Sequence, residues 1–476
     1  MRPLPTARLS PSPSSKPVKL LTIINGSPKG KKSISLKYVE YLQTTHPDTE
    51  FRIFHVAQEI RSYAAQKDYW EPLMASLRES EGVIWTFPVY VFNVPSALMR
   101  FLELVSDYGM EEAFKGLYTC CVSSSIHFYD NLANDYMRGV LEDFGMLYTD
   151  YFAADQDDFF KREMRAKLEC FYASFQHTVE RAMPSIRRFP YHPESSLHYQ
   201  PGPAPDSLPL AGMKITIIVD AGAGHNLSGM VSRLAACFRG EVNILELDKL
   251  NMRGGCLGCM KCAFDNECTY GDKDDIKRSY NTLLDPADII IYAGRLHHRF
   301  FSSAMRLFVE RRFMRTHFPF MKGKQVALLV EGPMSASHIL YQSFDADVQV
   351  SEGNFAGAVS DEFATSAQLD AAIDALALRL FTFASEAYVA PFDFQGVGGH
   401  KVFRDAIWGR YRFIFQADHA YYKRNSLYDF PQYDWRSRWR NFWIMLRLRN
   451  PRIRRQVRNT LSGYMVKPFF DNLKNL

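Results

Sequence analysis

A diverged internal repeat constrains this chain more than any other feature of its sequence. Two stretches of the 476 residues alternate short apolar runs with amphipathic runs. Ser96 and Glu103 of the first stretch correspond to Ser303 and Glu310 of the second, and both pairs are 207 positions apart. A fixed offset indicates repeated supersecondary structure. We therefore predict two related halves. Chance similarity between two α/β domains is the alternative.

Short apolar runs between turn residues predict the strands of each half. In the first half these runs are residues 20–25, 51–56, 82–87 and 117–123, and in the second 214–219, 242–247, 288–292 and 325–330. Strands of this kind that alternate with helices form a parallel sheet covered on both faces. The predicted fold class is α/β with two doubly wound parallel sheets. A helix within residues 155–182 is expected to cover the first sheet.

The two halves differ in length near their beginnings. Their first strands align at an offset of about 195 rather than 207, so the second half has about a dozen extra residues. A loop with four cysteines, residues 256–268, is of that size and lies in that interval. We interpret this loop as an insertion after the second strand.

The predicted organisation has five parts. They are a flexible tail (1–18), a first domain (19–182), a Pro/Ser-rich linker (183–212), a second domain (213–395) and a basic, aromatic-rich helical extension (396–476). The linker is expected to tolerate change. The tail has no apolar core of a secretion signal, although its lack of acidic residues leaves organelle targeting as an alternative. No uncharged apolar run reaches the ~18 residues of a spanning helix. We expect a cytoplasmic protein, with a location peripheral to a membrane as the second choice.

A phosphate-binding turn is predicted after the first strand. Residues 26–36 read GSPKGKKSISL, and a turn between a strand and a helix presents free backbone N–H groups at the positive end of the helix dipole. Serine hydroxyls and lysine charge would complete the cradle. The turn is neither a P-loop nor a dinucleotide fingerprint. An ordinary βα turn is the alternative interpretation.

Two further loops follow the third and fourth strands, at residues 87–95 (FPVYVFNVP) and 122–129 (VSSSIHFY). Ligands of open α/β sheets bind beyond the carboxyl ends of the strands. Three loops at that edge could hold a phosphate, a ribityl chain and a flat ring. The aromatic residues of these loops could instead serve only in packing.

The three loops together resemble the NADPH-dependent FMN reductase group of the flavodoxin-like superfamily. The resemblance covers residues 19–182 and implies a flavodoxin-like fold, FMN as cofactor and NAD(P)H as a candidate electron donor. It implies that the phosphate contacts Ser27, Pro28, Lys29, Ser33 and Ser35, that the isoalloxazine contacts Pro88, Val89, Tyr90, Phe92 and Asn93, and that Ser124, Ser125 and His127 lie at its other edge. Ile34 departs from the asparagine that is usual in the family.

Four of the eight cysteines form a compact motif, Cys256, Cys259, Cys262 and Cys268, with the spacing C-x2-C-x2-C-x5-C. Such runs of thiolates hold iron–sulfur clusters, which favours a 4Fe–4S site. Structural zinc and unoccupied thiols are the alternatives. The remaining cysteines, Cys120, Cys121, Cys170 and Cys237, are expected to be small buried side chains.

The second half resembles the iron–sulfur flavoproteins, relatives of the FMN reductases, over about residues 213–390. It departs from the flavin-binding pattern, because Arg295, His297 and Phe300 stand where the first half has Pro88, Tyr90 and Asn93. We therefore place no second flavin in this half. Adjacent His297 and His298 are interpreted as rim histidines rather than metal ligands.

The C-terminal region is strongly basic. Residues 400–476 contain 17 Lys/Arg and 5 Asp/Glu, a balance of +12, which leaves −7 for the rest of a chain whose net charge is +5. Within it, residues 435–458 combine one aromatic helical face with arginines. Packing across the acidic body, contact with a membrane surface and docking of a redox partner are the interpretations. Nucleic-acid binding is disfavoured because no known module is present.

The expected function is redox chemistry. We predict an FMN-dependent oxidoreductase that passes electrons between a flavin and a 4Fe–4S cluster, with a redox protein or a small molecule as acceptor. One alternative is an NAD(P)H-dependent quinone or nitro-compound reductase with structural cysteines. Another is a cluster-bearing scaffold that docks through its basic tail. No acid or base is required, so no catalytic side chain is predicted. The two halves are expected to pack with the cysteine loop facing the flavin edge near Tyr90 and Tyr129, and homo-oligomers are a further expectation.

Overall fold

The computed structural model describes residues 18–191, 197–203 and 205–473. Most of the predicted N-terminal tail therefore lies outside the described residues. The chain divides into two compact units, one that ends at His419 and one that comprises Ala420–Leu476.

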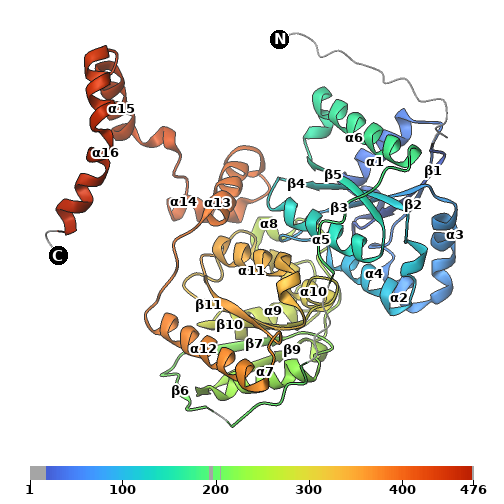
Figure 1. Ribbon diagram of the computed structural model, residues 1–476, viewed down its shortest axis with the longest axis horizontal. Coiled ribbons are helices and arrows are strands. Elements are labelled where there is room, and N and C mark those ends of the chain that lie inside the picture. The colour runs from blue at the N-terminus through green and yellow to red at the C-terminus, as the bar shows by residue number, and fades with distance from the viewer. Residues whose placement is uncertain (1–17, 192–196, 204, 474–476) are drawn as a thin grey trace. The chain divides into compact units, whose positions relative to one another are not determined.

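The first half of the repeat forms a five-stranded parallel sheet (Figure 1). Its strands lie in the order β2-β1-β3-β4-β5. They are β1 (Leu20–Asn25), β2 (Glu50–Phe54), β3 (Gly82–Pro88), β4 (Tyr118–Ser125) and β5 (Leu147–Asp155). The helices are α1 (Ile34–Thr45), α2 (Ile60–Ala65), α3 (Glu71–Glu79), α4 (Ser96–Asp107), α5 (Asp130–Asp143) and α6 (Arg162–Glu180). As predicted, α6 covers this sheet, because Leu168 and Phe175 pack with Ile23.

The second half forms a sheet with the same strand order, β9-β7-β10-β11-β12 when read in the same direction. Its strands are β7 (Ile215–Val219), β9 (Val242–Glu246), β10 (Ile289–Arg295), β11 (Gln325–Glu331) and β12 (Asn354–Ser360). The helices are α7 (His225–Ala236), α8 (Cys262–Asp265), α9 (Ile276–Ser279), α10 (Ser303–Arg311), α11 (His338–Val350) and α12 (Ser366–Ser385). This order is that of doubly wound flavodoxin-like sheets, so the predicted fold class is confirmed.

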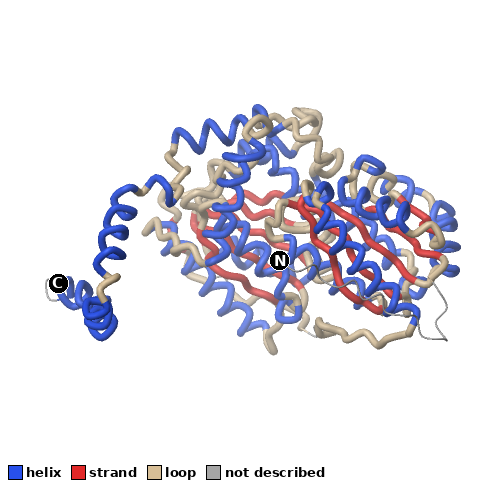
Figure 2. The backbone as a smooth tube through the Cα atoms, turned by 90° about the horizontal axis from the view of Figure 1, so that it is seen from above, coloured by secondary structure: helices blue, strands red, loops and turns tan. Residues whose placement is uncertain are grey.

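The two sheets also share their strand register. Ile23 pairs with Ile84 in the first sheet, and Ile217 pairs with Ile291 in the second. Figure 2 shows the strands gathered in two groups with helices around them. The cysteine loop lies between β9 and α9, after the second strand of its half, where the sequence predicted an insertion.

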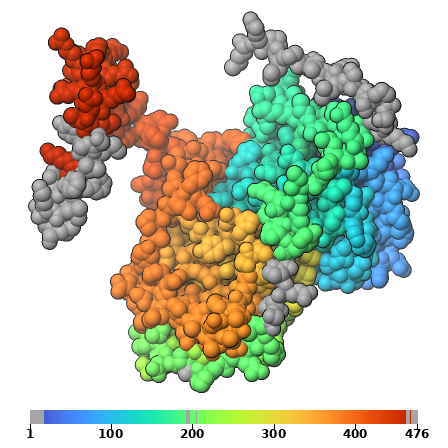
Figure 3. Space-filling view, in the orientation of Figure 1, coloured from blue at the N-terminus to red at the C-terminus, as the bar shows by residue number. Residues whose placement is uncertain are grey.

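Helices α4 and α10 pack against one another and join the halves. The backbone N–H and the hydroxyl of Ser96 donate to Glu310, at 2.9 and 2.5 Å. The same two groups of Ser303 donate to Glu103, both at 2.5 Å. Because these are the residues that the repeat aligns, the contact is that of a two-fold interface within one chain. Figure 3 shows the first half, blue to teal-green, abutting the second half, bright green to orange.

The segment between the halves is not the free tether that we expected. Within its described residues, Phe189 and Tyr199 are buried. The Tyr199 hydroxyl donates to Asp370 at 2.6 Å, and strand β6 (Leu208–Pro209) pairs with β8 (Phe238–Arg239). Apolar side chains and hydrogen bonds therefore anchor this segment, whose composition alone indicates flexibility, and its tolerance of change stays a prediction.

The predicted C-terminal extension is divided between the two units. Helix α13 (Phe394–Ala406) and a π-helical turn (Ile407–Tyr411) belong to the first unit. Helix α14 (Gln416–Arg424) crosses the boundary, and α15 (Trp435–Arg447) and α16 (Pro451–Leu473) form the second unit. Across the described residues, no helix has the length and apolar character needed to span a bilayer.

Candidate functional site

A cavity of about 310 Å³ lies at the carboxyl ends of the strands of the first sheet. It is bordered by all three loops that the sequence singled out, after β1, β3 and β4. Nine predicted flavin residues line it: Ser27, Lys29, Ser33, Pro88, Val89, Tyr90, Phe92, Ser124 and Ser125. Loops from three strands therefore converge on one site, as expected for this class of sheet.

The turn after β1 has the structure of an anion cradle. Asn25 ties it together, because its amide donates to the Gly30 carbonyl and accepts from the Ser27 N–H. Gly30 has a φ of 54°, and a Cβ there would lie 1.8 Å from Gln58. A short 3-10 turn then leads into α1, whose N-terminal amides face this turn. Lys29 has no carboxylate partner among the described residues, so its charge is available to a phosphate.

The loop after β3 is a tight turn closed by a bridge between Tyr90 and Asn93. Val91 and Phe92 have φ values of 42° and 68°, a left-handed conformation that costs energy for such side chains. Arg306 of α10 holds it: its guanidinium donates to the carbonyls of Val91 and Val94, each at 2.9 Å, and also to that of Tyr90. Burial lowers the pKa of Arg306. The second half therefore fixes the shape of the loop after β3 in the first half.

Four predicted flavin residues do not border the cavity. Ser35 is buried, and its hydroxyl shares a hydrogen bond of 2.8 Å with the Ser33 hydroxyl. Asn93 is also buried, and its side-chain amide oxygen accepts a hydrogen bond from the Val94 N–H. Pro28 lies in the turn but not on the wall. His127 is half-exposed and contacts Asp130 at 3.0 Å, an interaction that raises its pKa. Ser35 and Asn93 thus shape the site from behind.

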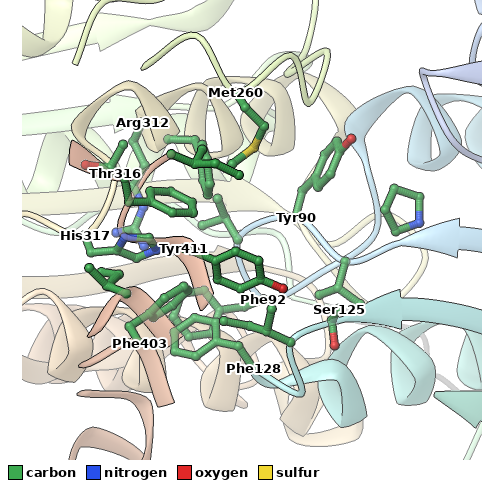
Figure 4. Close-up of a pocket in the computed structure, with 18 of the residues that line it drawn as sticks. Tyr90, Phe92, Ser125, Phe128, Met260, Arg312, Thr316, His317, Phe403 and Tyr411 are labelled. Carbon is green, nitrogen blue, oxygen red and sulfur yellow. The ribbon is translucent and has the colours of Figure 1, made fainter. Parts of the chain in front are cut away.

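The opposite wall comes from segments far along the chain (Figure 4). The second half contributes Met260, Arg312, Phe313, Arg315, Thr316, His317, Phe318, Phe320, Val350 and Ser351. The last part of the first unit contributes Phe403, Ile407, Tyr411, Ile414 and Phe415. Phe403 packs on Phe128, with ring centroids 4.3 Å apart, and on His317 at 3.6 Å. This wall is largely aromatic and suits a flat ligand.

Ion pairs hold this wall in place. Arg410 binds Asp155 at 2.9 Å and Asp157 at 2.7 Å, which ties the π-helical turn to the end of β5. The Asp418 carboxylate accepts from the Thr316 hydroxyl at 2.7 Å and from the His317 N–H at 2.9 Å. The sequence did not predict these residues as part of a site, because only the folded chain brings them to the first sheet.

The cysteine loop packs against the flavin loops. A Cβ placed on Gly258 would lie 2.0 Å from the Tyr90 hydroxyl and 2.8 Å from the Lys29 side chain. Burial, followed by the nearness of Cys256 and Glu310, raises the pKa of Tyr90 far above its ordinary value. Tyr129 instead donates to the Gln395 carbonyl. The loop therefore faces the ring-binding turn at Tyr90.

The four motif cysteines are free thiols in different surroundings. Cys262 is buried, Cys256 and Cys268 are partly exposed, and Cys259 is exposed. Burial raises the pKa of Cys262 to about 12, which favours its neutral thiol. Across the described part of the chain, no group of three or more His, Cys, Asp or Glu side chains is arranged to hold a metal ion. The donor set is right for a cluster, but its arrangement does not fit one. Of the other cysteines, three are buried as expected, whereas Cys170 is exposed.

The corresponding region of the second half is filled by its own side chains. Glu331 stands where the first half has Ser124, and its carboxylate accepts from the Leu227 N–H at the start of α7, at 3.0 Å. A Cβ on Gly224 would lie 2.1 Å from the same carboxylate. An internal anion thus occupies the helix N-terminus that a phosphate would need.

The bridged turn after the third strand is retained in the second half with different side chains. His297 and Phe300 form the same bridge as Tyr90 and Asn93, and Arg299 has a φ of 66° where Phe92 has 68°. Arg299 is fully buried and binds Asp143 of α5 at 2.7 and 2.8 Å.

Comparison with protein families agrees with the fold. Residues 19–170 match the sequence profile of a family described as having a flavodoxin-like fold. This stretch holds the first sheet and all three loops of the cavity. No curated protein matches the chain.

Solved structures of similar fold cover about a third of the chain. One is the flavoenzyme NAD(P)H:(acceptor) oxidoreductase FerB from Paracoccus denitrificans, 18% identical over 34% of this chain and 98% of that one, with a TM-score of 0.30. A second is an NADH:FMN oxidoreductase in its apo form, 20% identical over 34% and 89%, with a TM-score of 0.29. A third is general stress protein 14 from Treponema denticola in complex with FMN, 18% identical over 33% and 98%, with a TM-score of 0.27.

Proposed function

We propose that this protein is an FMN-dependent oxidoreductase that takes electrons from NAD(P)H and passes them to a flat aromatic acceptor. The observation that carries the proposal is the convergence of three loops from β1, β3 and β4 on one cavity with an opposite aromatic wall. The names of the structures of similar fold describe FMN or NAD(P)H chemistry in those proteins. Bound FMN would supply transfer of an electron pair.

The residues fit this cofactor. Ser27, Lys29 and Ser33 surround the N-terminal turn that a phosphate requires. The buried Tyr90 hydroxyl has no hydrogen-bond partner among the described side chains, so a ligand atom could satisfy it. The apolar wall formed by Phe403, Ile407 and Tyr411 would exclude water from the ring and leave a slot for a second planar molecule. The chain's own part is to bind, orient and shield.

The first test is flavin content. Denatured protein should release FMN, and Ser27→Asp should abolish this release, because an added carboxylate repels the phosphate. Lys31→Gln makes the same change in net charge at an exposed position outside the cavity and should keep its FMN. Steady-state oxidation of NAD(P)H with a quinone should fall together with flavin content. Stoichiometric FMN in the Ser27 variant would refute the site.

A second candidate function is electron transfer through an iron–sulfur cluster. The spacing of the cysteines and the contact of their loop with Tyr90 and Lys29 support it. Because the arrangement of the thiols does not fit a cluster, we derive no step through one. Iron and sulfide measured after anaerobic purification test this function. If the parent protein contains iron and sulfide, Cys259→Ala should remove both, while Cys170→Ala, a change at an exposed cysteine of α6, should not. Zinc in place of iron would assign the loop to structural sites.

A further inference from the structure

The second unit, Ala420–Leu476, carries most of the excess positive charge of the chain. It contains 13 Lys/Arg and 3 Asp/Glu, a balance of +10, against a net charge of +5 for the whole protein. The rest of the chain is therefore at −5. A charge of this size on a small helical unit favours an anionic partner.

Helix α15 exposes large apolar side chains together with this charge. Seven of them are between 41% and 69% exposed: Trp435, Trp439, Phe442, Trp443, Ile444, Met445 and Leu446. None of the helix's residues is buried. A soluble surface does not normally leave so many contiguous large apolar side chains in water. Within its own unit, the helix therefore has an exposed apolar face that is suited to a binding partner.

The aromatic side chains lie together on one face of α15. At about 100° per residue, Trp435, Trp439 and Leu446 lie within an arc of about 40°, with Phe442 and Trp443 beside them. The rings of Trp439 and Phe442 are 5.9 Å apart, and those of Phe442 and Trp443 are 5.7 Å apart. These contacts form a continuous aromatic surface along two turns of helix.

Arginines border this aromatic surface on both sides. On one flank lie Arg436, Arg440 and Arg447, at about 100–140° around the helix axis from Trp435. Arg438 lies on the other flank. The Arg438 guanidinium lies over the Trp435 ring at 4.5 Å. Asp434 fixes the start of the helix by accepting from the Ser437 N–H at 3.0 Å. Arginine heads beside an aromatic face can reach outward to phosphates while the rings enter an apolar layer.

We propose that α15 lies in the surface of an anionic lipid bilayer, with its aromatic face in the acyl boundary and its arginines on lipid phosphates. A helix with this division of faces binds through buried apolar area and attraction to anionic lipids together. Nucleic acid would use the arginines but would leave the wide aromatic face in water. The following helix, α16, adds Arg452, Arg454, Arg455 and Arg458 to the same unit.

Sedimentation of the full-length protein with vesicles tests the proposal. Vesicles of phosphatidylcholine with about one third phosphatidylglycerol should retain the protein, and vesicles of phosphatidylcholine alone should bind it at least about tenfold more weakly. Arg436→Gln/Arg440→Gln/Arg447→Gln should weaken binding to the anionic vesicles by about 100-fold, at about 1 kcal/mol for each arginine. Lys37→Gln/Lys115→Gln/Lys167→Gln removes three exposed charges from the first unit and should bind as the parent does.

The aromatic face needs a separate test. Trp439→Ala/Phe442→Ala/Trp443→Ala should also abolish sedimentation, while Phe160→Ala, at a side chain 78% exposed in the first unit, should leave it unchanged. The thermal unfolding midpoint of the first unit should be the same in all variants. Three results would overturn the proposal: equal binding to both kinds of vesicle, binding to duplex DNA but not to vesicles, or a lowered unfolding midpoint in the aromatic variant.

Discussion

The two halves of the first unit share a fold and a turn, but the side chains at the corresponding cradle are cationic and hydroxyl-bearing in the first half and anionic in the second. Both have the same strand order, and both have the bridged left-handed turn after the third strand. In the first half, hydroxyls and Lys29 surround an open cradle, whereas in the second the Glu331 carboxylate fills it. The backbone of a site can therefore persist after its side chains have closed it.

The two halves also differ in the contacts that their bridged turns make with the opposite half. Phe92 of the first half packs with Ala346 on α11 of the second, and Arg299 packs against Gly139 on α5 of the first. These positions correspond through the repeat offset of 207. One side is an apolar contact that borders the cavity, and the other is a buried ion pair with Asp143. The asymmetry leaves an open cavity beside the first sheet, whereas Glu331 fills the corresponding cradle of the second half.

The largest effect is expected at Arg306, whose guanidinium binds the loop after β3 of the first half and also lies 4.0 Å from Glu310. Arg306→Met should lower the free energy of unfolding by about 4 kcal/mol, because four backbone carbonyls lose a buried cationic donor. FMN should be lost as well. Met99→Leu, at the corresponding position of α4, should cost less than about 1.5 kcal/mol and keep the flavin. Urea unfolding and flavin content measure both, and an Arg306→Met protein with normal flavin content would contradict the account.

A pH dependence should come from Asp220, which stands where the first half has Gly26. Burial raises the pKa of its carboxyl to about 7. The folded state binds the proton of this carboxyl group more tightly than the unfolded state does. Its contribution to the free energy of unfolding is therefore complete below about pH 4 and is lost as the pH rises through about 7.

The parent should therefore lose about 3 kcal/mol of stability, relative to Asp220→Asn, between about pH 4 and pH 8. Guanidinium unfolding across this range gives the difference. Parallel curves for the two proteins would show that Asp220 does not titrate in this window.

The reciprocal serine–glutamate contacts should contribute nearly equally. Glu103→Gln and Glu310→Gln should each lower stability by about 2 kcal/mol, because a carboxylate that accepts two hydrogen bonds is replaced by a neutral amide. Glu310→Gln should cost slightly more, since Glu310 also accepts from the Cys256 N–H at 2.7 Å. Thermal unfolding measures both variants. A loss confined to one of them would disprove the symmetry of the interface.

The smallest effect is expected at Glu331. Glu331→Ser copies Ser124 of the first half and should cost about 1 kcal/mol, since the Leu227 N–H loses its acceptor. The FMN content should stay at one for each chain, because the second half has no counterpart of Lys29. Two flavins in this variant would show that Glu331 alone closes the second site.

The sequence predicted the strands whose segments are rich in large apolar side chains, and these include the half-exposed edge strands β2 and β9. The eight predicted strands are present, and Ile23 and Ile217 lie at the centres of the two sheets. The edge strands β5 and β12 were missed, because half-exposed strands such as LYTDYFAAD and NFAGAVS lack a continuous apolar run. Gly357 weakens the pattern of β12 further.

For the candidate site, the sequence predicted the wall that is local in the chain and missed the opposite one. The three loops follow strands directly, so strand order alone brings them together. Phe403, Tyr411 and Arg312 reach the cavity only through packing of α13 and α10 across the first half, which no local pattern encodes. The role of Arg306 was missed for the same reason.

Arg306 also sets when the site can be finished during synthesis. The carbonyls that it binds, from Tyr90 to Val94, emerge from the ribosome more than 200 residues before it does. At roughly 5–20 residues per second, this interval lasts on the order of 10–40 s. During that time the first sheet can form, but its left-handed turn has no cation to hold it. The cavity therefore reaches its final shape late, after most of both halves has been translated.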